Sequence, residues 1–242
     1  MSNDIVTAGI IIIGNEVLTA KITDLNGPYL IQQLNQHGID VMDMRTIRDD
    51  LNTIADCVHD MASHLTYVFT SGGIGPTHDD LTIRGVAMGL KKTMERNAEL
   101  EKALRLFWGP NASDTQLGLA DVPENTQITF HRKGFPVLRT DNVFMLPGVP
   151  SFLRACYETL APSLRQGTTM HTKRLYIRAD ETAIATPLAH VQQLYPDVAI
   201  GSYPTYESTE YQVLVTLDSR DPIVLNQAYQ SLIGILNVPW FT

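Results

Sequence analysis

Residues 70–82 read Thr-Ser-Gly-Gly-Ile-Gly-Pro-Thr-His-Asp-Asp-Leu-Thr and carry the strongest structural signal in the chain. This stretch follows the apolar run 67–71, which is typical of a buried strand, and it precedes a helical apolar pattern over 83–90. Its three glycines let the backbone turn tightly and approach a ligand without side-chain obstruction. Consecutive N–H groups in such a turn, with those that begin the next helix, form a concave anion site. The stretch therefore predicts a strand, a phosphate-binding loop and a helix.

Two carboxylates follow the glycines and modify this prediction. The predicted ligand-binding residues of the loop are Ser71, Gly72, Gly73, Gly75, Pro76 and Thr77. Asp79 and Asp80 contradict simple anion binding, because carboxylates repel a phosphate, and a divalent cation such as magnesium would bridge the two groups. The structural alternative is a glycine-rich turn in which one of these acids only caps the following helix. The stretch is neither a Walker loop nor a GxGxxG fingerprint.

Strands and amphipathic helices alternate along roughly the first 165 residues. The run from Ala8 to Ile13 is continuously apolar, as in a strand covered on both faces. Further strands are predicted at 39–44, 67–71 and 143–146, with helices between them. A polar, proline-containing stretch follows a helix near 98–107. This rhythm predicts an α/β fold with a mostly parallel sheet between helix layers.

The pattern restarts after Gly167-Thr168-Thr169, which predicts a boundary between domains at 1–167 and 168–242. The order of elements in the second domain is βαββα, typical of a small α+β domain. Pro187 lies inside the first helix of this domain and suggests that Thr186 caps a fresh helix start.

In such sheets, ligands bind beyond the carboxyl ends of the strands. The loops after Ser71 and Leu146 both lie at that edge, so we expect Pro147 and Gly148 to wall the site, with a simple strand-ending turn as the alternative. Three polar residues after the first strand could bind ribose or base: Glu16, Asp24 and Asn26. For the last of these, a helix cap is the alternative.

Composition narrows the class of partner. A formal net charge of −8 argues against nucleic acid, but a local site can still accept a small anion. The apolar run at 10–13 is too short for a signal-peptide core or a membrane span, so we expect no membrane partner and a cytoplasmic location. Cys57 and Cys156 fall inside helical apolar patterns, which predicts buried thiols rather than a disulfide.

Four separated motifs resemble one known family. The glycine-rich stretch looks like the signature of molybdopterin-binding-like domains, which occur in molybdenum-cofactor proteins of the MogA/MoaB type, in CinA and at the N-terminus of FAD synthases. Residues 13–26 and 146–150 resemble the opening and the second ligand loop of the CinA and FAD-synthase branch, and residues 179–182, 201–204 and 211–213 look most like FAD synthases. The resemblance covers nearly the whole chain.

The resemblance implies a three-layer α/β/α domain, a metal-dependent acid at Asp80 and a second acid that matches Asp49. In the CinA and FAD-synthase branch it implies pyrophosphate hydrolysis of FAD or ADP-ribose, favoured by cobalt and potassium ions. The sequence contains no amidohydrolase or adenylyltransferase domain, so we expect hydrolysis or binding rather than FAD synthesis. Relatives commonly form dimers or trimers, so a homo-oligomer is expected.

Each acid has a structural alternative. Asp49 and Asp50 could cap the helix that starts near Leu51, and Asp79 is expected to orient the loop more than to ligate metal. We assign metal binding to Asp80 and Asp49, and catalytic roles to these two residues and Asp79.

Three functions compete. The first is a hydrolase, a divalent-metal pyrophosphatase that converts a dinucleotide to AMP and a monophosphate. The second is a molybdopterin-binding or adenylylating protein of molybdenum-cofactor synthesis. The third is a non-catalytic nucleotide-binding subunit. All three predict a small phosphorylated ligand, a dinucleotide or a pterin.

Overall fold

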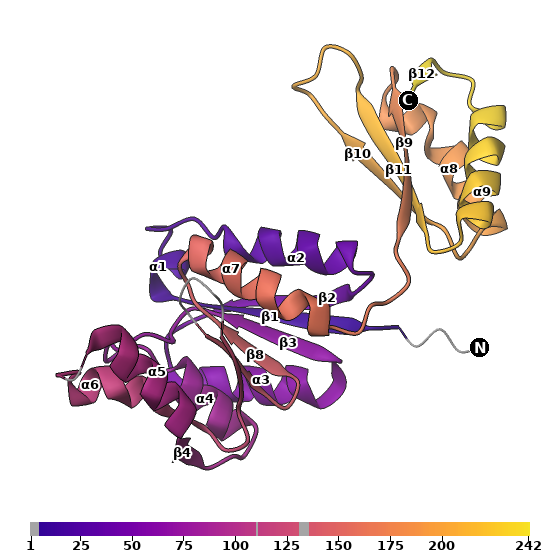
Figure 1. Ribbon diagram of the computed structural model, residues 1–242. Coiled ribbons are helices and arrows are strands. Elements are labelled where there is room, and N and C mark those ends of the chain that lie inside the picture. Colours follow the sequence, from indigo (N-terminus) through magenta and orange to yellow (C-terminus); the bar gives the residue numbers. More distant parts are fainter. Residues whose placement is uncertain (1–4, 110, 131–135) are drawn as a thin grey trace. The chain divides into compact units, whose positions relative to one another are not determined.

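The computed structural model describes residues 5–109, 111–130 and 136–242. Contacts within the chain divide it into two compact units, residues 1–167 and 168–242 (Figure 1). Each unit has its own sheet and its own buried core.

The N-terminal unit is built on a six-stranded sheet with the order β2-β1-β3-β8-β7-β6. The strands are β1 (Thr7–Ile13), β2 (Asp40–Ile47), β3 (Tyr67–Ser71), β6 (Gln127–Thr129), β7 (Val137–Thr140) and β8 (Val143–Leu146). The flanking helices are α1 (Asn15–Leu18), α2 (Asn26–Gln36), α3 (Leu51–His64), α4 (Thr82–Gly89), α7 (Pro150–Leu160) and the 3-10 turn η2 (Ala161–Ser163). Strands β2, β1, β3 and β8 pair in parallel, whereas β8, β7 and β6 pair antiparallel. The mostly parallel α/β sheet predicted from the sequence is confirmed.

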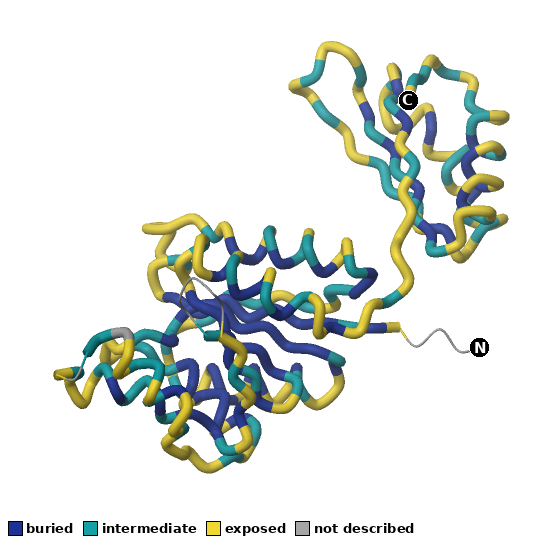
Figure 2. The backbone as a smooth tube through the Cα atoms, in the orientation of Figure 1, coloured by how far each residue is buried: buried dark blue, intermediate teal, exposed yellow. Residues whose placement is uncertain are grey.

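Helices cover both faces of this sheet, which gives three layers. Helices α2 and α7 cover one face, and α3 and α4 cover the other (Figure 1). Successive strand residues point to opposite faces, so Ile10 packs with residues of α2 and α7 while Ile11 packs with residues of α3 and α4. Both isoleucines are fully buried, and the central strands form the buried middle of the unit in Figure 2. The continuous apolar run in β1 therefore reflects burial on both sides.

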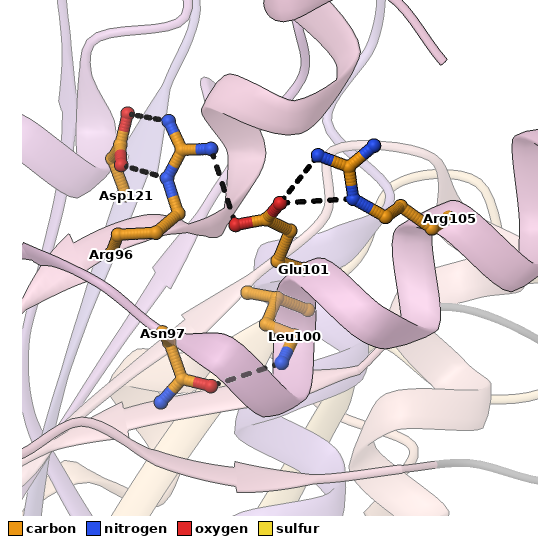
Figure 3. Close-up of polar contacts among 6 residues, drawn as sticks. All are labelled: Arg96, Asn97, Leu100, Glu101, Arg105 and Asp121. Atoms are coloured by element: carbon orange, nitrogen blue, oxygen red, sulfur yellow. Dashed lines mark hydrogen bonds and ion pairs between the residues drawn. The ribbon is translucent and has the colours of Figure 1, made fainter. Parts of the chain in front are cut away.

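A small lobe lies between α4 and β6. It contains β4 (Met94–Arg96), α5 (Ala98–Trp108), α6 (Asp114–Leu117), the 3-10 turn η1 (Gly118–Ala120) and β5 (Asp121–Pro123). Strands β4 and β5 pair antiparallel, and Arg96 Nη2 donates to Asp121 Oδ2 at 3.0 Å across that ladder. Glu101 on α5 joins Arg96 to Arg105, as Figure 3 shows. In this lobe the sequence predicts only the helix α5, followed by a polar stretch. That stretch contains the short elements α6 and β5.

The C-terminal unit is an antiparallel sheet with the order β10-β11-β9-β12. Its elements are β9 (His171–Ile177), η3 (Glu181–Ala183), α8 (Ala185–Leu194), β10 (Ala199–Pro204), β11 (Val213–Ser219), α9 (Pro222–Ile235) and β12 (Trp240–Phe241). The βαββα order is present, with the short β12 added beside β9. The expected cap at Thr186 is wrong: α8 begins at Ala185, so Thr186 lies inside its first turn. Asp180 instead caps the preceding turn, η3, through the N–H groups of Thr182 and Ala183.

Candidate functional site

Loops that follow β1, β2, β3 and β8 line one cavity of about 580 Å³ in the N-terminal unit. The predicted ligand-binding residues that line it are Glu16, Asp24, Asn26, Ser71, Gly72, Gly73, Gly75, Thr77, Pro147 and Gly148. All three acids given catalytic roles line it as well: Asp49, Asp79 and Asp80. Pro76 does not; it lines a second cavity, with His78 and Arg84, that shares Gly75, Thr77 and Asp80 with the first. The structure thus brings together residues from four predicted loops.

Asn26 ties these loops to one another. Its buried side-chain nitrogen, Nδ2, donates to Ser71 Oγ at 2.9 Å and to the Gly148 carbonyl oxygen at 2.7 Å. The expected alternative, a helix cap at this residue, is wrong, because Asp24 accepts from the N–H groups of Asn26 and Gly27 at the start of α2. Asn26 Oδ1 accepts no hydrogen bond within the described part of the chain, so one polar atom of this side chain is left for a ligand.

The loop over residues 72–75 turns tightly, as its glycines predict, and its first glycine is required for packing between strands. Gly72 has φ +103° and Gly73 has φ +65°. A Cβ on Gly72 would lie 2.2 Å from the carbonyl oxygen of Ile13 in β1, so this glycine permits close packing of two strand ends. Its N–H donates to the Leu146 carbonyl oxygen at 3.1 Å and is not free for an anion. Gly72 lines the cavity, and its predicted ligand contact stays a prediction, but its amide cannot supply that contact.

Three consecutive backbone N–H groups remain for an anion. Within residues 5–109, 111–130 and 136–242, the N–H groups of Gly73, Ile74 and Gly75 donate to no acceptor. Thr82, the first residue of α4, binds the start of the loop. Its buried hydroxyl donates to the Gly72 carbonyl oxygen at 2.7 Å, and its N–H donates to the Gly73 carbonyl oxygen at 2.9 Å. The loop is therefore held by its ends while its middle keeps unused donors, as in an anion-binding nest.

The acids after the glycines are ordered by Thr77. Asp80 Oδ2 accepts from the Thr77 N–H at 2.8 Å and also from the Thr77 hydroxyl. The Thr77 side chain lowers the pKa of Asp79 below its usual value, with smaller contributions from Asp79's own backbone and from His78. Asp80 therefore orients the loop with one oxygen and has its second oxygen for another ligand. Neither acid caps α4, whose N-terminal flank is Leu81.

Asp49 and Asp50 have separate roles. Asp50 caps α3 by accepting from the Thr53 N–H at 2.8 Å, and these contacts with Thr53 lower the pKa of Asp50. Asp49 instead reaches back to α1, where its Oδ2 accepts from the Asn15 N–H at 2.8 Å. The capping alternative therefore holds for Asp50 only, and Asp49 lines the cavity.

Among the described residues, every charged side chain that lines the cavity is acidic. Five carboxylates line it: Glu16, Asp24, Asp49, Asp79 and Asp80. In the described part of the chain, no lysine, arginine or histidine lines this cavity. Oxygen donors of this kind are the ligands preferred by magnesium and related hard cations. Over residues 5–109, 111–130 and 136–242, no three His, Cys, Asp or Glu side chains gather as a metal site on their own. The metal role of Asp80 and Asp49 stays a prediction.

Sequence reasoning missed an apolar part of the same cavity. Exposed apolar side chains from the loop before α2 and from the start of α7 line its rim: Ile22, Leu25, Val149 and Phe152. One signal was available in the sequence. Phe152 falls outside the buried stripe of α7, which consists of Leu153, Cys156, Tyr157 and Leu160.

The fold and this cavity define the class of protein: a molybdopterin-binding-like α/β/α domain followed by a small sheet-containing domain. A solved structure of CinA from Thermoplasma acidophilum superposes with a TM-score of 0.61 at 23% identity, over 66% of this chain and 98% of that one. At that identity the likeness concerns the fold. The predicted fold class is confirmed.

Sequence families extend this result to both units. Residues 9–166 match the family described as probable molybdopterin binding domain, and residues 169–239 match the middle domain of FAD synthase. The chain belongs to the probable molybdopterin-binding domain family, as its motifs predicted.

Two curated relatives differ in how much of their own length this chain covers. A protein of Archaeoglobus fulgidus is 30% identical over 229 residues, which cover 94% of this chain and 97% of the relative. A probable FAD synthase of Caenorhabditis elegans is 28% identical over 260 residues, with 95% of this chain but only 50% of the relative covered. The chain thus spans about half the length of that synthase. Within the described residues, no helix combines the length and apolarity needed to cross a membrane.

Proposed function

We propose that the chain is a divalent-metal nucleotide pyrophosphatase that hydrolyses FAD, ADP-ribose or a related dinucleotide to AMP and a second monophosphate. The observation that carries the proposal is the pairing of three unused N–H donors, from Gly73 to Gly75, with five carboxylates as the charged side chains of the cavity lining. The N–H groups suit an anion, whereas the carboxylates suit a cation. A diphosphate that carries a divalent cation satisfies both groups at once.

The donor set fits such a cation. Magnesium is usually held by one or two carboxylates together with substrate phosphates, so a pre-formed cluster of three protein ligands is not required. Asp80 and Asp49 would hold it, because each has one carboxylate oxygen engaged by the protein and a second that accepts no hydrogen bond in the described residues. When bound, a divalent cation offsets the charge of the phosphate oxygens and favours a nucleophilic water. Cobalt or magnesium would supply this chemistry, and potassium would be an additional ion.

The chain's own groups then perform three tasks. The N–H groups of Gly73, Ile74 and Gly75 bind the phosphoryl oxygens, where negative charge builds in the transition state. Asn26 Oδ1 accepts from a ribose hydroxyl. Glu16, whose carboxylate accepts no hydrogen bond in the described part of the chain, takes the proton from the water that attacks one phosphorus. The bond from that phosphorus to the bridging oxygen breaks, and the other phosphate leaves with the bridging oxygen.

The test is hydrolysis by the Asp80→Asn variant. Purified protein is incubated with FAD and with ADP-ribose in the presence of cobalt, magnesium or chelator, and the products are separated by chromatography. We expect AMP and the partner monophosphate from the wild-type chain, none with chelator, and at least about a hundredfold slower turnover in the variant.

A matched control separates this effect from general charge loss. Asp56 is an exposed acid on α3 outside the cavity, so Asp56→Asn should hydrolyse at the wild-type rate. Circular dichroism checks that both variants fold. Wild-type turnover in Asp80→Asn would reject the role of Asp80 and with it this mechanism. Saturable nucleotide binding with no product under any metal would reject the hydrolase and leave a binding protein.

A further inference from the structure

The rim of the candidate site is apolar and open to solvent. Ile22, Leu25, Val149 and Phe152 are each between 51% and 58% exposed, and all four line the cavity that holds the acids and the glycine loop. Isolated exposed apolar residues are ordinary, but several that meet at one cavity mark a binding surface. An occupant of this cavity therefore meets polar groups on one side and apolar groups on the other.

All four residues line the cavity, although they lie up to 130 positions apart in the sequence, and hydrogen bonds join the segments of three of them: Leu25, Val149 and Phe152. The Asn26 side chain donates to the Gly148 carbonyl oxygen at 2.7 Å, which joins the two chain segments. Leu25 and Val149 are the immediate sequence neighbours of these two bonded residues. Phe152 is held beside Val149, because its N–H donates to the Val149 carbonyl oxygen at 3.0 Å in the first turn of α7.

Phe152 is not needed for the core of the unit. The side chains of α7 that pack against the sheet are Leu153, Cys156, Tyr157 and Leu160, all at most 2% exposed. Phe152 is one helical step, about 100°, away from Leu153, and so it points off the buried stripe. A half-exposed aromatic ring at the edge of a polar cavity offers a flat surface for a second flat ring.

We infer that Ile22, Leu25, Val149 and Phe152 form a subsite for a planar heteroaromatic ring of the ligand, with Phe152 as the stacking residue. The inference deepens the proposed function, since it places the ring beside a diphosphate held at Gly73–Gly75. The chemistry suits an adenine or an isoalloxazine, which are flat, largely apolar on their faces and joined to the diphosphate by a polar sugar-like linker. Stacking of a base on an aromatic side chain contributes about 5- to 100-fold in affinity.

The test compares ligands with and without a ring, using compounds that cannot be hydrolysed. The ring-free probe is methylenediphosphonate with magnesium, and the ring-bearing probes are α,β-methylene-ADP with magnesium and FMN. Dissociation constants are measured by calorimetry for the wild-type chain, Phe152→Ala, Phe152→Tyr and Leu106→Ala. Leu106 is a matched control: it is 79% exposed on α5 and does not line this cavity.

We expect Phe152→Ala to weaken binding of at least one ring-bearing probe by about 5- to 100-fold. The same variant should leave methylenediphosphonate within about twofold of wild type, because the ring-free probe does not reach the rim. Phe152→Tyr should restore affinity to within about threefold, and Leu106→Ala should bind like wild type. The probe that loses affinity identifies the ring as adenine or isoalloxazine.

Other outcomes separate this inference from the proposed function. Unchanged affinity of both ring-bearing probes in Phe152→Ala overturns the ring subsite and leaves hydrolysis unaffected. If the ring effect is present but no dinucleotide is hydrolysed, the subsite stands and the pyrophosphatase fails. If Phe152→Ala instead dissociates an oligomer in sedimentation, with ring affinity unchanged, the rim belongs to an interface between copies and the inference is wrong.

Discussion

The Asn26 side chain donates to the carbonyl oxygen of Gly148, 122 residues further along the chain, at 2.7 Å. The same nitrogen also donates to Ser71 Oγ at 2.9 Å. One buried amide therefore fixes the ends of the loops that follow β1, β3 and β8 relative to one another. Because the glycine loop, the apolar rim and all of the cavity's acids except Asp49 belong to these loops, Asn26 helps to set the shape of the candidate site.

We expect Asn26→Ala to destabilise the N-terminal unit by about 1–3 kcal/mol, since it leaves a buried hydroxyl and a carbonyl without their donor. Unfolding in urea measures this change. The chain has two tryptophans, one in each unit, so a Trp240→Phe background lets Trp108 fluorescence report on the N-terminal unit alone. Asn35→Ala, at an exposed position of the same helix, should change the free energy of unfolding by at most about 0.5 kcal/mol. Equal effects of the two substitutions would contradict the bridging role.

Gly72 and Gly118 should respond in opposite ways to alanine. Gly72 has φ +103° and no room for a Cβ beside Ile13 O, so Gly72→Ala should cost more than about 3 kcal/mol or prevent folding. Gly118 has φ −57° and no atom within 4 Å of a new Cβ, so Gly118→Ala should be neutral or stabilise by up to about 1 kcal/mol. Thermal unfolding of the two variants measures both effects, and a well-folded Gly72→Ala would show that the loop tolerates another conformation.

The central part of this fold was predictable because its signals are local. A continuous apolar run such as β1 indicates burial on both faces, and the glycines at 72–75 directly after a strand indicate a tight loop. Since ligand-binding loops follow the carboxyl ends of parallel strands, the sequence also predicts that the loops after β3 and β8 lie at the same edge of the sheet. These arguments account for the sheet layers and for the residues that line the cavity.

The remaining features depend on contacts that local patterns do not contain. Strands β4, β5 and β6 have three residues each, too short to show an alternating pattern. The role of Asn26 is set by partners 45 and 122 positions away, and a helix cap was the simplest local explanation for an asparagine there. Thr186 was assigned as a cap because Pro187 follows it, but proline is tolerated within the first helical turn, where its missing N–H has no partner to lose.

Burial of Cys156 predicts a loss of stability at alkaline pH. Burial raises the pKa of its thiol from the usual 9.0 to about 11, so the folded chain keeps this proton while the unfolded chain releases it. The unfolded state then binds fewer protons, and stability present below pH 9 is lost as the pH rises toward 11. Cys156→Ala removes the titrating thiol, so the free energy of unfolding of the variant should not show this pH dependence. The difference in free energy of unfolding between wild type and Cys156→Ala should therefore narrow by roughly 1–2 kcal/mol between pH 8 and pH 11. Urea unfolding at several pH values measures the gap; a constant gap would refute the prediction.

Thr77 should act on turnover through Asp80 rather than by touching the ligand's reacting atoms. Its hydroxyl and N–H both donate to Asp80 Oδ2, and the other carboxylate oxygen of this cavity-lining residue accepts no hydrogen bond in the described part of the chain. Thr77→Val keeps the side-chain volume and the N–H but loses the hydroxyl. We expect turnover of FAD or ADP-ribose to fall about 10- to 100-fold, with a higher metal concentration at half-maximal activity. Thr77→Ser should restore both values, because it returns the hydroxyl.

Since Thr77 is exposed, the unfolding midpoint should hardly move in either variant. An equal loss of activity in Thr77→Ser would mean that the methyl group matters and that Asp80 is not positioned by this hydrogen bond.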